Sequence, residues 1–466
     1  MPDDTAARPA QRTTARNDTS AAELLAAHPW VARVRAAQDG GLLVTPAASA
    51  TAAAPVPGPL VREHLDQWAE VYEFVYETGE GRRSDDLDLS GWRASDTGRP
   101  LPEEHMRDWV DRTVELVLAQ QPRRVMELGC GTGLLAHRLH PALDGYVGTD
   151  VAQVAVDRLA AAELPHTAFV RAAAHEAGSP QVRQAAHRVF GDGVRPDCVL
   201  LNSVTQCFPD LAYLTAVLHG AIAAVEDGGT VIVGDNRHSA LLEEHFGALE
   251  RLRDPEAGAA DLASRTAAAV AADEELSFAP AAVARAAAAQ SRPVRMGVHA
   301  RTMADASELT RYRYDLVLHV GPGAEEATAS AVHRETWQAH RDRGLHAALR
   351  VALARRPAVL SGIPNALLTD APGGLTPHAL RKALTGTDSA VLLDAADPRM
   401  LAVAAPPGAG AVPVEEVAEP LSGPAAHEPL PAFVSRRLPE VLRDHLRRAA
   451  PGTVPPRITV TPGDAA

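Results

Sequence analysis

Short apolar runs alternate with longer helical patterns through the middle of the chain. The expected strands are residues 125–128, 145–150, 168–172, 198–201 and 231–234. A helical pattern over 102–120 precedes them, residues 241–289 nearly all favour helix, and the alternating run 312–318 predicts a late strand that closes the sheet. Strands that alternate with helices predict an α/β fold, a doubly wound parallel sheet with helices on both faces.

The first strand runs directly into a glycine-rich loop. Gly129, Gly131 and Gly133 stand at every second position after Glu127. Glycines at this spacing let the backbone turn sharply and approach a ligand closely. A helix expected over 134–139 points its N-terminal amides at an anionic group, such as the carboxylate of a methionine. The loop is typical of the cofactor site of class I S-adenosylmethionine-dependent methyltransferases.

An acidic residue, Asp150, ends the second expected strand. A doubly wound sheet presents a carboxylate at this place to the two hydroxyls of a ribose. The competing interpretation of the loop is a nicotinamide or flavin site, whose fingerprint is G-x-G-x-x-G. Here the third glycine, Gly133, comes one position too early for that fingerprint. Loop and acid together therefore favour S-adenosylmethionine as the cofactor.

The composition is that of an ordinary globular protein, with 46% hydrophobic and 22% charged residues among 466. A net charge of −14 argues against nucleic acid and anionic membranes as partners, because both need clustered basic side chains. No apolar run approaches the roughly 20 residues of a membrane span. The three cysteines lack disulfide or metal spacing and the histidines lack paired ligand spacing, so we expect a cytoplasmic protein without a metal.

Four further segments lie in order between His64 and Leu318. They read Gln-Trp-Ala-Glu-Val-Tyr at 67–72, Gly-Trp-Arg-Ala-Ser-Asp-Thr-Gly at 91–98, Asn-Ser-Val-Thr-Gln-Cys-Phe-Pro at 202–209 and Glu-Leu-Thr-Arg-Tyr-Arg-Tyr-Asp at 308–315. This set resembles the methyltransferase domains that are inserted into adenylation domains of nonribosomal peptide synthetases. The resemblance implies a class I methyltransferase with a Rossmann-like sheet, S-adenosylmethionine as its cofactor, and a role in secondary metabolism such as antibiotic biosynthesis.

The flanks of the chain resemble the small C-terminal subdomain of the adenylation enzymes that host such insertions. The matching pieces are His28–Ala32, Gly362–Asn365, Leu438–Leu446 and Val454–Pro456. No large adenylation subdomain or ATP loop is recognised, so we expect a free-standing methyltransferase that does not activate amino acids, with a small α+β domain built from both flanks. The expected segments are a disordered tail at 1–20, a subdomain-like piece with linker at 21–57, the methyltransferase domain at 58–325 and a subdomain-like region at 326–466.

The cofactor set combines the loop, the acid and the residues that follow the third and fourth strands. It comprises Glu127, Gly129, Cys130, Gly131, Gly133, Asp150, Ala174, His175, Glu176 and Asn202. The family usually has an acid after the third strand, and His175 stands at that place here. Either Glu176 or the nearby backbone contacts the adenine amine, or His175 does so as an acceptor, or His175 is an ordinary loop residue.

The substrate set follows from strand ends and from departures from the family motifs. It comprises Arg93, Ser95, Asp96, Ser203, Gln206 and Cys207. Arg93 replaces an Asn, while Asp96 and Cys207 each replace a Tyr. These changes predict a more polar substrate, unless they are neutral drift in a loop. Cys207 is not expected as a nucleophile, because methyl transfer needs no covalent enzyme intermediate.

Three further residues are candidates for the chemistry itself. Asp235 or Glu308 is expected as a general base, and Arg237 as a bidentate holder of a substrate carboxylate. Each also fits an ordinary polar residue that caps a helix or joins strands. In-line transfer of a methyl group depends mainly on alignment in a dry pocket, so a strong base is not always required.

The leading hypothesis is N-methylation of an amino acid, or of an aminoacyl or peptidyl intermediate bound to a carrier protein. The alternative within enzymes is C- or O-methylation of a free amino acid or aryl acid. An alternative of another class is a catalytically inert module that docks onto a synthetase. Expected partners are therefore a small-molecule or carrier-bound substrate and a nonribosomal peptide synthetase, and a homodimer is left open.

Overall fold

The computed structural model describes residues 21–84, 86–322, 332–395, 397–417, 425–452 and 454–461. The chain divides into two compact units. The smaller unit comprises Met1–Gln67 with Glu428–Ala466, and the larger comprises Trp68–His427. The tail predicted at 1–20 lies outside the described residues.

The smaller unit brings residues from both flanks of the chain into one small α+β fold. Its elements are β1 (Val31–Ala36), β2 (Leu42–Pro46), α2 (Ala48–Thr51), the first half of α3 (Pro59–Thr78), α17 (Leu430–Ala449) and β19 (Ile458–Val460). β2 is the central strand, with β1 antiparallel on one side and β19 parallel on the other. Arg437 of α17 forms an ion pair with Glu63 of α3 at 2.7 Å.

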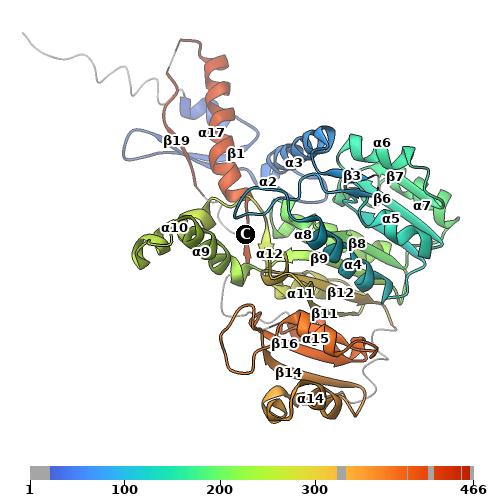
Figure 1. Ribbon diagram of the computed structural model, residues 1–466. Coiled ribbons are helices and arrows are strands. Elements are labelled where there is room, and N and C mark those ends of the chain that lie inside the picture. Colours follow the sequence, from blue (N-terminus) through green and yellow to red (C-terminus); the bar gives the residue numbers. More distant parts are fainter. Residues whose placement is uncertain are drawn as a thin grey trace, which may run out of the picture. The chain divides into compact units, whose positions relative to one another are not determined.

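The larger unit contains the predicted parallel sheet. Its five parallel strands are β5 (Arg124–Leu128), β6 (Gly145–Asp150), β7 (Thr167–Arg171), β8 (Cys198–Asn202) and β9 (Thr230–Arg237). Their order in the sheet is β7-β6-β5-β8-β9, and all four neighbouring pairs are parallel. The order reverses between β5 and β8, which makes this the switch point where doubly wound sheets bind ligands beyond the strands' carboxyl ends. Figure 1 shows β7 at one end of the sheet and β14 near the other.

Antiparallel strands continue the sheet beyond β9. They are β12 (Arg313–Val320), β11 (Val294–Ala300), β15 (Ala390–Leu393), β16 (Met400–Ala405) and β14 (Ala358–Pro364), and β13 (His333–Thr336) adds a last strand parallel to β14. The predicted late strand is β12, but it lies inside the sheet, between β9 and β11, and does not close it. β11 was not predicted, because residues 241–289 and their neighbours favour helix.

The predicted boundary at 325/326 does not coincide with the boundary between the two units. The reason is that β11 pairs with β15, so residues 332–417 continue the large sheet. The segment Gly362–Asn365 therefore lies in the larger unit, at the end of β14, whereas Leu438–Leu446 lies in the smaller one. That the smaller unit is an adenylation-type subdomain stays a prediction.

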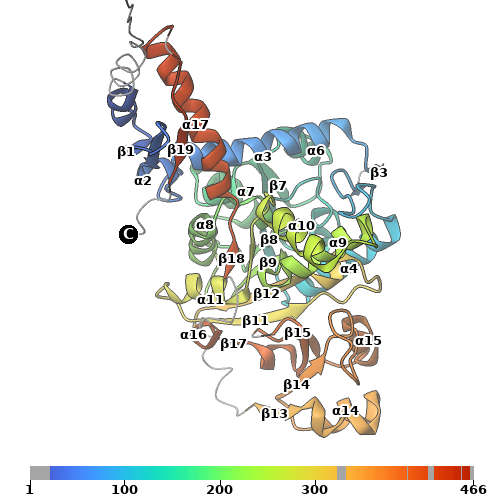
Figure 2. The same ribbon diagram turned by 90° about the vertical axis from the view of Figure 1, so that its left-hand side faces the viewer.

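Besides the second half of α3, the larger unit contains further helices, some of which flank the parallel strands (Figures 1 and 2). They are α4 (Glu103–Leu118), α5 (Ala136–Leu139), α6 (Gln153–Ala161), α7 (Pro180–Phe190), α8 (Leu211–Ala224), α9 (Leu242–Arg253), α10 (Ala259–Ala271), α11 (Pro280–Ala288), α12 (Glu308–Arg311), α14 (Leu345–Ala352), α15 (Pro377–Ala383) and α16 (Val414–Val417). The short strands are β3 (Arg82–Ser84), β4 (Leu87–Asp88), β10 (Ser277–Phe278), β17 (Val412–Pro413) and β18 (Ala426–His427). The 3-10 helices are η1 (His140–Ala142), η2 (Ala174–Glu176), η3 (Thr205–Cys207), η4 (Ser239–Leu241), η5 (Trp337–Ala339), η6 (Arg341–Arg343) and η7 (Pro407–Gly410).

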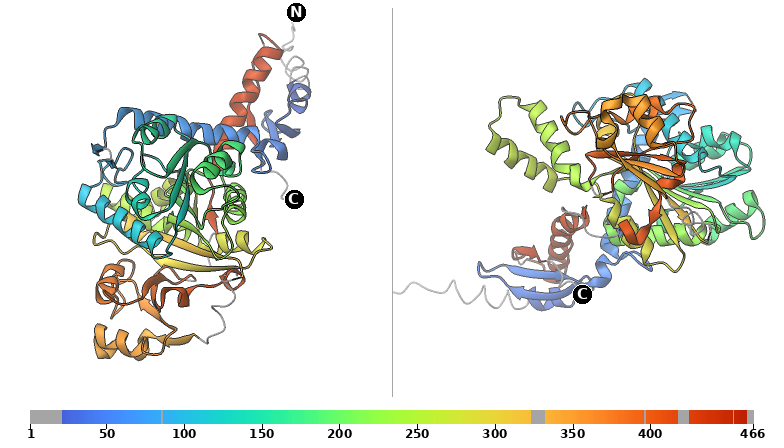
Figure 3. Two further views of the ribbon diagram at one scale, coloured as in Figure 1. Left: turned by 90° about the vertical axis from the view of Figure 1, so that its right-hand side faces the viewer. Right: turned by 90° about the horizontal axis from the view of Figure 1, so that it is seen from below.

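The core of the larger unit lies between α4 and the sheet. Met106 and Trp109 of α4 are buried in one cluster with Val125 of β5, Leu200 of β8 and Val317 of β12. By contrast, α10 buries no residue, and Figure 3 shows α9 and α10 as a pair of helices that projects from the sheet. Within the described ranges, every helix is too short or too polar to cross a membrane.

Candidate cofactor and substrate site

The glycine loop after β5 has a backbone that only glycine adopts without strain. The φ angles of Gly129, Gly131 and Gly133 are +84°, +50° and +84°. A Cβ atom on Gly129 would lie 2.6 Å from a methyl carbon of Val204, and one on Gly133 would lie 2.3 Å from a methyl carbon of Leu159. The loop is therefore packed on both sides, and its glycines are needed for shape as well as for flexibility.

The helix predicted over 134–139 is shorter than expected. It is α5 (Ala136–Leu139), a single turn that begins two residues later than predicted and is followed by η1. That its N-terminal amides meet an anionic group stays a prediction. Cys130 in the same loop is buried, and its N–H donates to a carbonyl of β6 at 2.8 Å.

Two buried acids organise the loop. Asp150, at the end of β6, accepts hydrogen bonds from the N–H groups of Gly131 at 2.8 Å and Ala152 at 2.9 Å. Glu127 of β5 is also buried, and its carboxyl accepts a hydrogen bond from the hydroxyl of Tyr146. Burial, and next the charge of Asp150, raise the pKa of Glu127 to about 8. Burial also raises the pKa of Asp150.

The raised pKa of Glu127 predicts how stability changes with pH. The folded protein keeps on Glu127 a proton that the unfolded chain releases near the ordinary pKa of 4.5, so the free energy of unfolding falls as pH rises from there to about 8. Glu127→Gln removes this titration. In the wild type, the free energy of unfolding, measured with urea, should drop as pH rises from about 6 to about 9. We expect this drop to be smaller in Glu127→Gln by on the order of 2 kcal/mol. Glu115→Gln, on the exposed side of α4, is the control, and equal pH profiles for both variants would contradict the prediction.

The residues predicted to contact adenine lie in η2, directly after β7. The Nδ1 atom of His175 is 2.7 Å from the hydroxyl of Tyr213, and burial lowers the pKa of His175. The carboxylate of Glu176 accepts the N–H of Ala173 at 2.9 Å and so closes the turn on itself. His175 is thereby held as a neutral, oriented ring. Which of the two contacts adenine stays a prediction.

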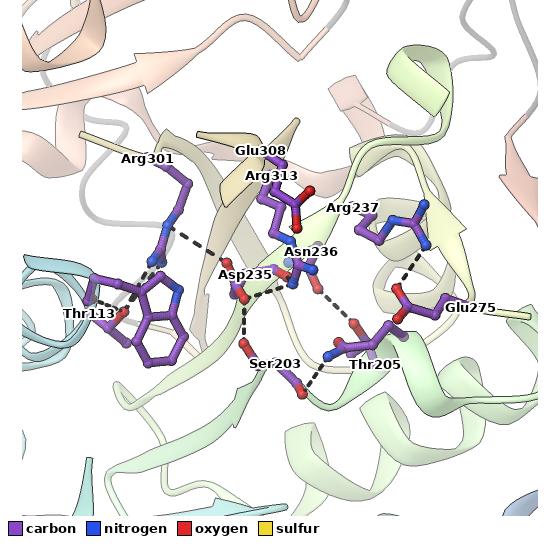
Figure 4. Close-up of polar contacts among 12 residues, drawn as sticks. Thr113, Ser203, Thr205, Asp235, Asn236, Arg237, Glu275, Arg301, Glu308 and Arg313 are labelled. Atoms are coloured by element: carbon purple, nitrogen blue, oxygen red, sulfur yellow. Dashed lines mark hydrogen bonds and ion pairs between the residues drawn. The ribbon is translucent and has the colours of Figure 1, made fainter. Parts of the chain in front are cut away.

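A cluster of polar side chains lies at the carboxyl ends of β8 and β9 (Figure 4). Ser203 and Asp235 both have left-handed backbones, with φ angles of +52° and +58°. The pairing of β9 with β12 shifts register at this point, as in a β-bulge. The carboxylate of Asp235 accepts hydrogen bonds from the Ser203 hydroxyl and from Nη1 of Arg313, the latter at 2.8 Å. Asp235 is 0% exposed, so its carboxylate lies in the interior of this cluster and not at its surface.

A second, fully buried layer supports this cluster. Nη1 of Arg301 donates to both oxygens of Asp315, at 2.9 and 3.1 Å, and lies 3.3 Å from the hydroxyl of Thr113. One oxygen of Asp315 accepts the backbone N–H of Asp235 at 2.7 Å. The guanidinium of Arg301 also lies over the ring of Trp109, 5.5 Å from its centroid. These contacts fix the backbone of Asp235 at the bulge.

Arg301, Arg313 and Asp315 were not predicted as site residues. Arg313 and Asp315 stand within the motif at 308–315 and within the expected strand at 312–318, but only Glu308 of that motif was nominated for the site. Charged residues in a strand that is otherwise apolar and lies inside a sheet are rarely buried without a partner. That signal was present for Arg313 and Asp315, but Arg301 lies in a part of the chain without any pattern.

Arg237 is already paired within the chain. Its Nη1 lies 3.0 Å from a carboxylate oxygen of Asp273 and 2.8 Å from one of Glu275. One nitrogen of the predicted fork is thus occupied by two carboxylates of the protein itself, and the role of Arg237 toward a substrate carboxylate stays a prediction. The neighbouring Asn236 accepts a hydrogen bond from the Thr205 hydroxyl at 3.0 Å, which ties the end of β9 to η3.

Three buried acceptor oxygens in this region lack a hydrogen-bond partner among the described residues. They are Oδ1 of Asn202, Oε1 of Gln206 and Oδ1 of Asp235. Nearby, Sγ of Cys207 lies 3.8 Å from the hydroxyl of Tyr72, and burial raises the pKa of this thiol far above its ordinary value. A protonated thiol is a poor nucleophile, in agreement with the expectation for Cys207.

The segment 91–98 reaches the cluster through one residue. Ser95 donates its hydroxyl and its N–H to the carboxylate of Glu308, at 2.9 and 3.3 Å. Arg93 is exposed and forms an ion pair with Glu80 at 2.6 Å. Asp96 is exposed as well, without a contact to the other candidate residues in the part of the chain that is described. The structure therefore joins Ser95 and Glu308 but leaves Arg93 and Asp96 on the surface.

Comparison with known proteins agrees with this geometry. Residues 126–231 match a family described as "Methyltransferase domain". The chain contains a methyltransferase domain. The probable nonribosomal peptide synthetase CymA of Salinispora arenicola is 38% identical over 266 residues, or 56% of this chain and 3% of that protein. Chondramide synthase of Chondromyces crocatus is 32% identical over 288 residues, or 61% and 7%.

The methyltransferase domain is thus related to domains of nonribosomal peptide synthetases, as the motifs predicted. The chain spans less than a tenth of the length of these curated relatives. Among solved structures, the N-methyltransferase NodS of Bradyrhizobium japonicum in complex with S-adenosyl-L-homocysteine is 14% identical. That similarity covers 56% of this chain and 99% of NodS with a TM-score of 0.32.

S-adenosylmethionine is the cofactor of such a domain, and the residues present fit it. The glycine loop leaves no room for side chains along its path, and Asp150 stands beside it at the end of β6. The unpartnered Oδ1 of buried Asn202 adds an acceptor at the end of the neighbouring strand β8. The cofactor and the enzyme class are as predicted, while the role of each single residue stays a prediction.

Proposed function

We propose that the protein transfers a methyl group from S-adenosylmethionine to the nitrogen of an amino acid or of a carrier-bound aminoacyl or peptidyl intermediate. The observation that carries the proposal is a buried, unpartnered acceptor in the turn after β8. Oε1 of Gln206 accepts no hydrogen bond from the described residues, whereas the similar oxygen of Asn202 belongs to the expected cofactor set. Acceptors of this kind suit a nucleophile that brings N–H donors, since an unsatisfied buried acceptor costs about 1–3 kcal/mol.

The residues divide the work of the reaction between binding and proton transfer. When bound, S-adenosylmethionine supplies a methyl group on a positively charged sulfur. In this proposal Asp150 binds the ribose hydroxyls, and Gln206 orients the amine in line with the methyl carbon. The amine nitrogen forms its bond to the methyl carbon as the carbon–sulfur bond breaks, and its surplus proton passes to a base or to water.

Glu308 is the better placed of the two candidate bases. It is partly exposed and held by Ser95, whereas Asp235 is fully buried and already accepts hydrogen bonds from Ser203 and Arg313. Asp235 therefore acts as a positioning residue in this proposal. An α-amino group titrates near 7.7–8.0 in peptides, so part of it is neutral even without help.

Replacing Glu308 by Gln keeps a partner for Ser95 but removes the base. We expect kcat to fall about tenfold near pH 7, at the modest end of general-base effects, because part of the amine is already neutral. The loss should shrink as pH rises and the amine deprotonates in solution. Glu243→Gln, an exposed position on α9, is the matched control. A loss that is constant across pH would assign Glu308 a structural role.

The proposal is tested with isotope-labelled S-adenosylmethionine and a panel of amino and aryl acids. Each acid is offered free and loaded on a carrier protein, and the products are fragmented in a mass spectrometer. Label on nitrogen supports the proposal, and label only on carrier-bound material supports a synthetase as the partner. Label on oxygen or carbon would replace it by the alternative O- or C-methylation, and failure to bind S-adenosylmethionine would leave the inert docking module.

A further inference from the structure

We propose that Arg313 binds the carbonyl oxygen next to the amine that is methylated, and so selects substrates that carry this carbonyl. The inference rests on the proposed function, because it assumes an amine nucleophile beside a carbonyl group. Arg313 stands at the start of β12, directly across from Arg237 of β9 in the sheet. It was not among the candidate residues of the sequence.

Arg313 has hydrogen-bond donors to spare. Its Nη1 donates to the carboxylate of Asp235 at 2.8 Å and to the backbone carbonyl of the same residue at 3.3 Å. A guanidinium has five N–H donors in a rigid fork, and the contacts of Arg313 with described residues all use Nη1. Its side chain is 14% exposed, so the other donors are not sealed inside the protein. The unused N–H groups can donate to an acceptor from a ligand, such as a carbonyl oxygen.

The two other arginines at this edge of the sheet are each paired with two carboxylates and are less exposed. Arg301 is 1% exposed, and its Nη1 is taken by Asp315 and Thr113. Arg237 is paired with two carboxylates, those of Asp273 and Glu275. Arg313 is therefore the most exposed guanidinium of the three, and among the described residues it is the one paired with a single carboxylate.

The surroundings of Arg313 place it near both the candidate base and the turn that holds the acceptor for the amine. In Figure 4 its guanidinium lies between the side chains of Glu308 and Asp235. Ser203, like Arg313, donates a hydrogen bond to the carboxylate of Asp235. Ser203 belongs to the same turn as Gln206, whose Nε2 donates to the Ser203 carbonyl at 2.8 Å. A substrate whose carbonyl meets Arg313 would thus present the adjacent nitrogen to Oε1 of Gln206, the unpartnered acceptor after β8.

The buried layer explains why Arg313 is held in place before a substrate arrives. Asp235 sits at a bulge with a left-handed backbone, and its N–H is fixed by Asp315, which in turn is fixed by Arg301. An arginine anchored at one edge of its fork loses little freedom on binding a ligand at the other. Arg301 and Asp315 are therefore positioning residues that act through Asp235.

The test compares two probes within each variant. The first is the N-acetylcysteamine thioester of an amino acid that the wild-type protein methylates, and the second is its thioether analogue, in which CH2 replaces the carbonyl. The ratio of kcat/KM for the two probes is insensitive to the fraction of folded enzyme. Comparison between variants also cancels the difference in intrinsic reactivity of the two amines. The free amino acid is a third probe, which shows whether a carboxylate serves as the carbonyl group.

We expect Arg313→Gln to lower the ratio of thioester to thioether by about 10- to 100-fold, the worth of one charge-assisted hydrogen bond. Arg237→Gln should leave the ratio within about threefold of wild type. Binding of S-adenosylmethionine, measured by calorimetry, should persist in both variants. An unchanged ratio in Arg313→Gln, or a collapse in Arg237→Gln instead, would overturn the inference. A wild-type protein that methylates no probe would overturn the proposed function itself.

Discussion

Replacing Asp150 by alanine is expected to weaken the binding of S-adenosylmethionine by about 100-fold or more. The carboxylate ends β6 beside the glycine loop, at the place where a doubly wound sheet presents an acid to ribose hydroxyls. A hydrogen bond to a charged group contributes about 1.5–3 kcal/mol, so the loss of two such bonds accounts for a factor of this size. The N–H of Gly131 also loses its acceptor, which loosens the loop.

The fold should survive this change. Burial raises the pKa of Asp150, which means that its charge is costly to bury and that its removal relieves this cost. The measurement is titration calorimetry with S-adenosylmethionine, together with urea unfolding to confirm a folded variant. Asp144→Asn, an exposed position just before β6, is the matched control and should bind like wild type. An affinity of Asp150→Ala within about threefold of wild type would remove Asp150 from the cofactor site.

The cofactor side of the site could be predicted because its signal is local. Gly129, Gly131 and Gly133 follow a strand within a few residues, and each must be glycine for reasons of backbone conformation and close packing. The acid Asp150 ends the very next strand. Such features depend on neighbours in sequence, so a single chain reveals them. The length of α5 was predicted wrongly, because the pattern of apolar residues does not show at which residue after the glycine loop the helix begins.

The substrate side could be predicted only in part, because it is assembled from distant segments. Ser203 and Asp235 were nominated as residues after strands, and the structure joins them. Arg301 and Asp315 meet only because β11, β12 and β9 are neighbours in the sheet, and the sequence had not predicted β11. Arg93 was nominated from a departure in a motif, but it forms a surface ion pair with Glu80. A departure from a family motif shows which residue differs from the family. The order of the strands decides whether that residue lies at the site.

The buried layer under Asp235 is the place where a single substitution should cost the most stability. Replacing Arg301 by methionine keeps the bulk of the side chain but leaves Asp315 without its cation. Breaking a buried ion pair by removing one partner costs about 3–5 kcal/mol, because an uncompensated charge stays in the interior. We expect a loss of this size in the free energy of unfolding, measured with urea at neutral pH.

The loss should depend on pH in a defined direction. Burial raises the pKa of Asp315, and the charge of Arg301 opposes this shift. Without Arg301 the pKa of Asp315 rises further, so the folded variant takes up a proton at low pH that the unfolded chain holds less tightly. An acid with a raised folded pKa destabilises increasingly as pH rises. The destabilisation of Arg301→Met should therefore be largest at high pH and shrink as pH falls.

Two further variants separate an unpaired charge from simple loss of packing. Asp315→Asn in the Arg301→Met background removes the stranded charge, so the double variant should be more stable than the single one, against additivity. Arg295→Met removes another buried arginine, at the opposite end of β11, whose guanidinium donates to the carbonyl of Ala411 and, among the described residues, not to a carboxylate. It should cost less than Arg301→Met and show a flatter pH profile. If Arg301→Met costs no more than Arg295→Met, or if the added Asp315→Asn only deepens the loss, the charge of Arg301 is not what holds the bulge. Asp235 and Arg313 would then owe their positions to packing of the strands alone.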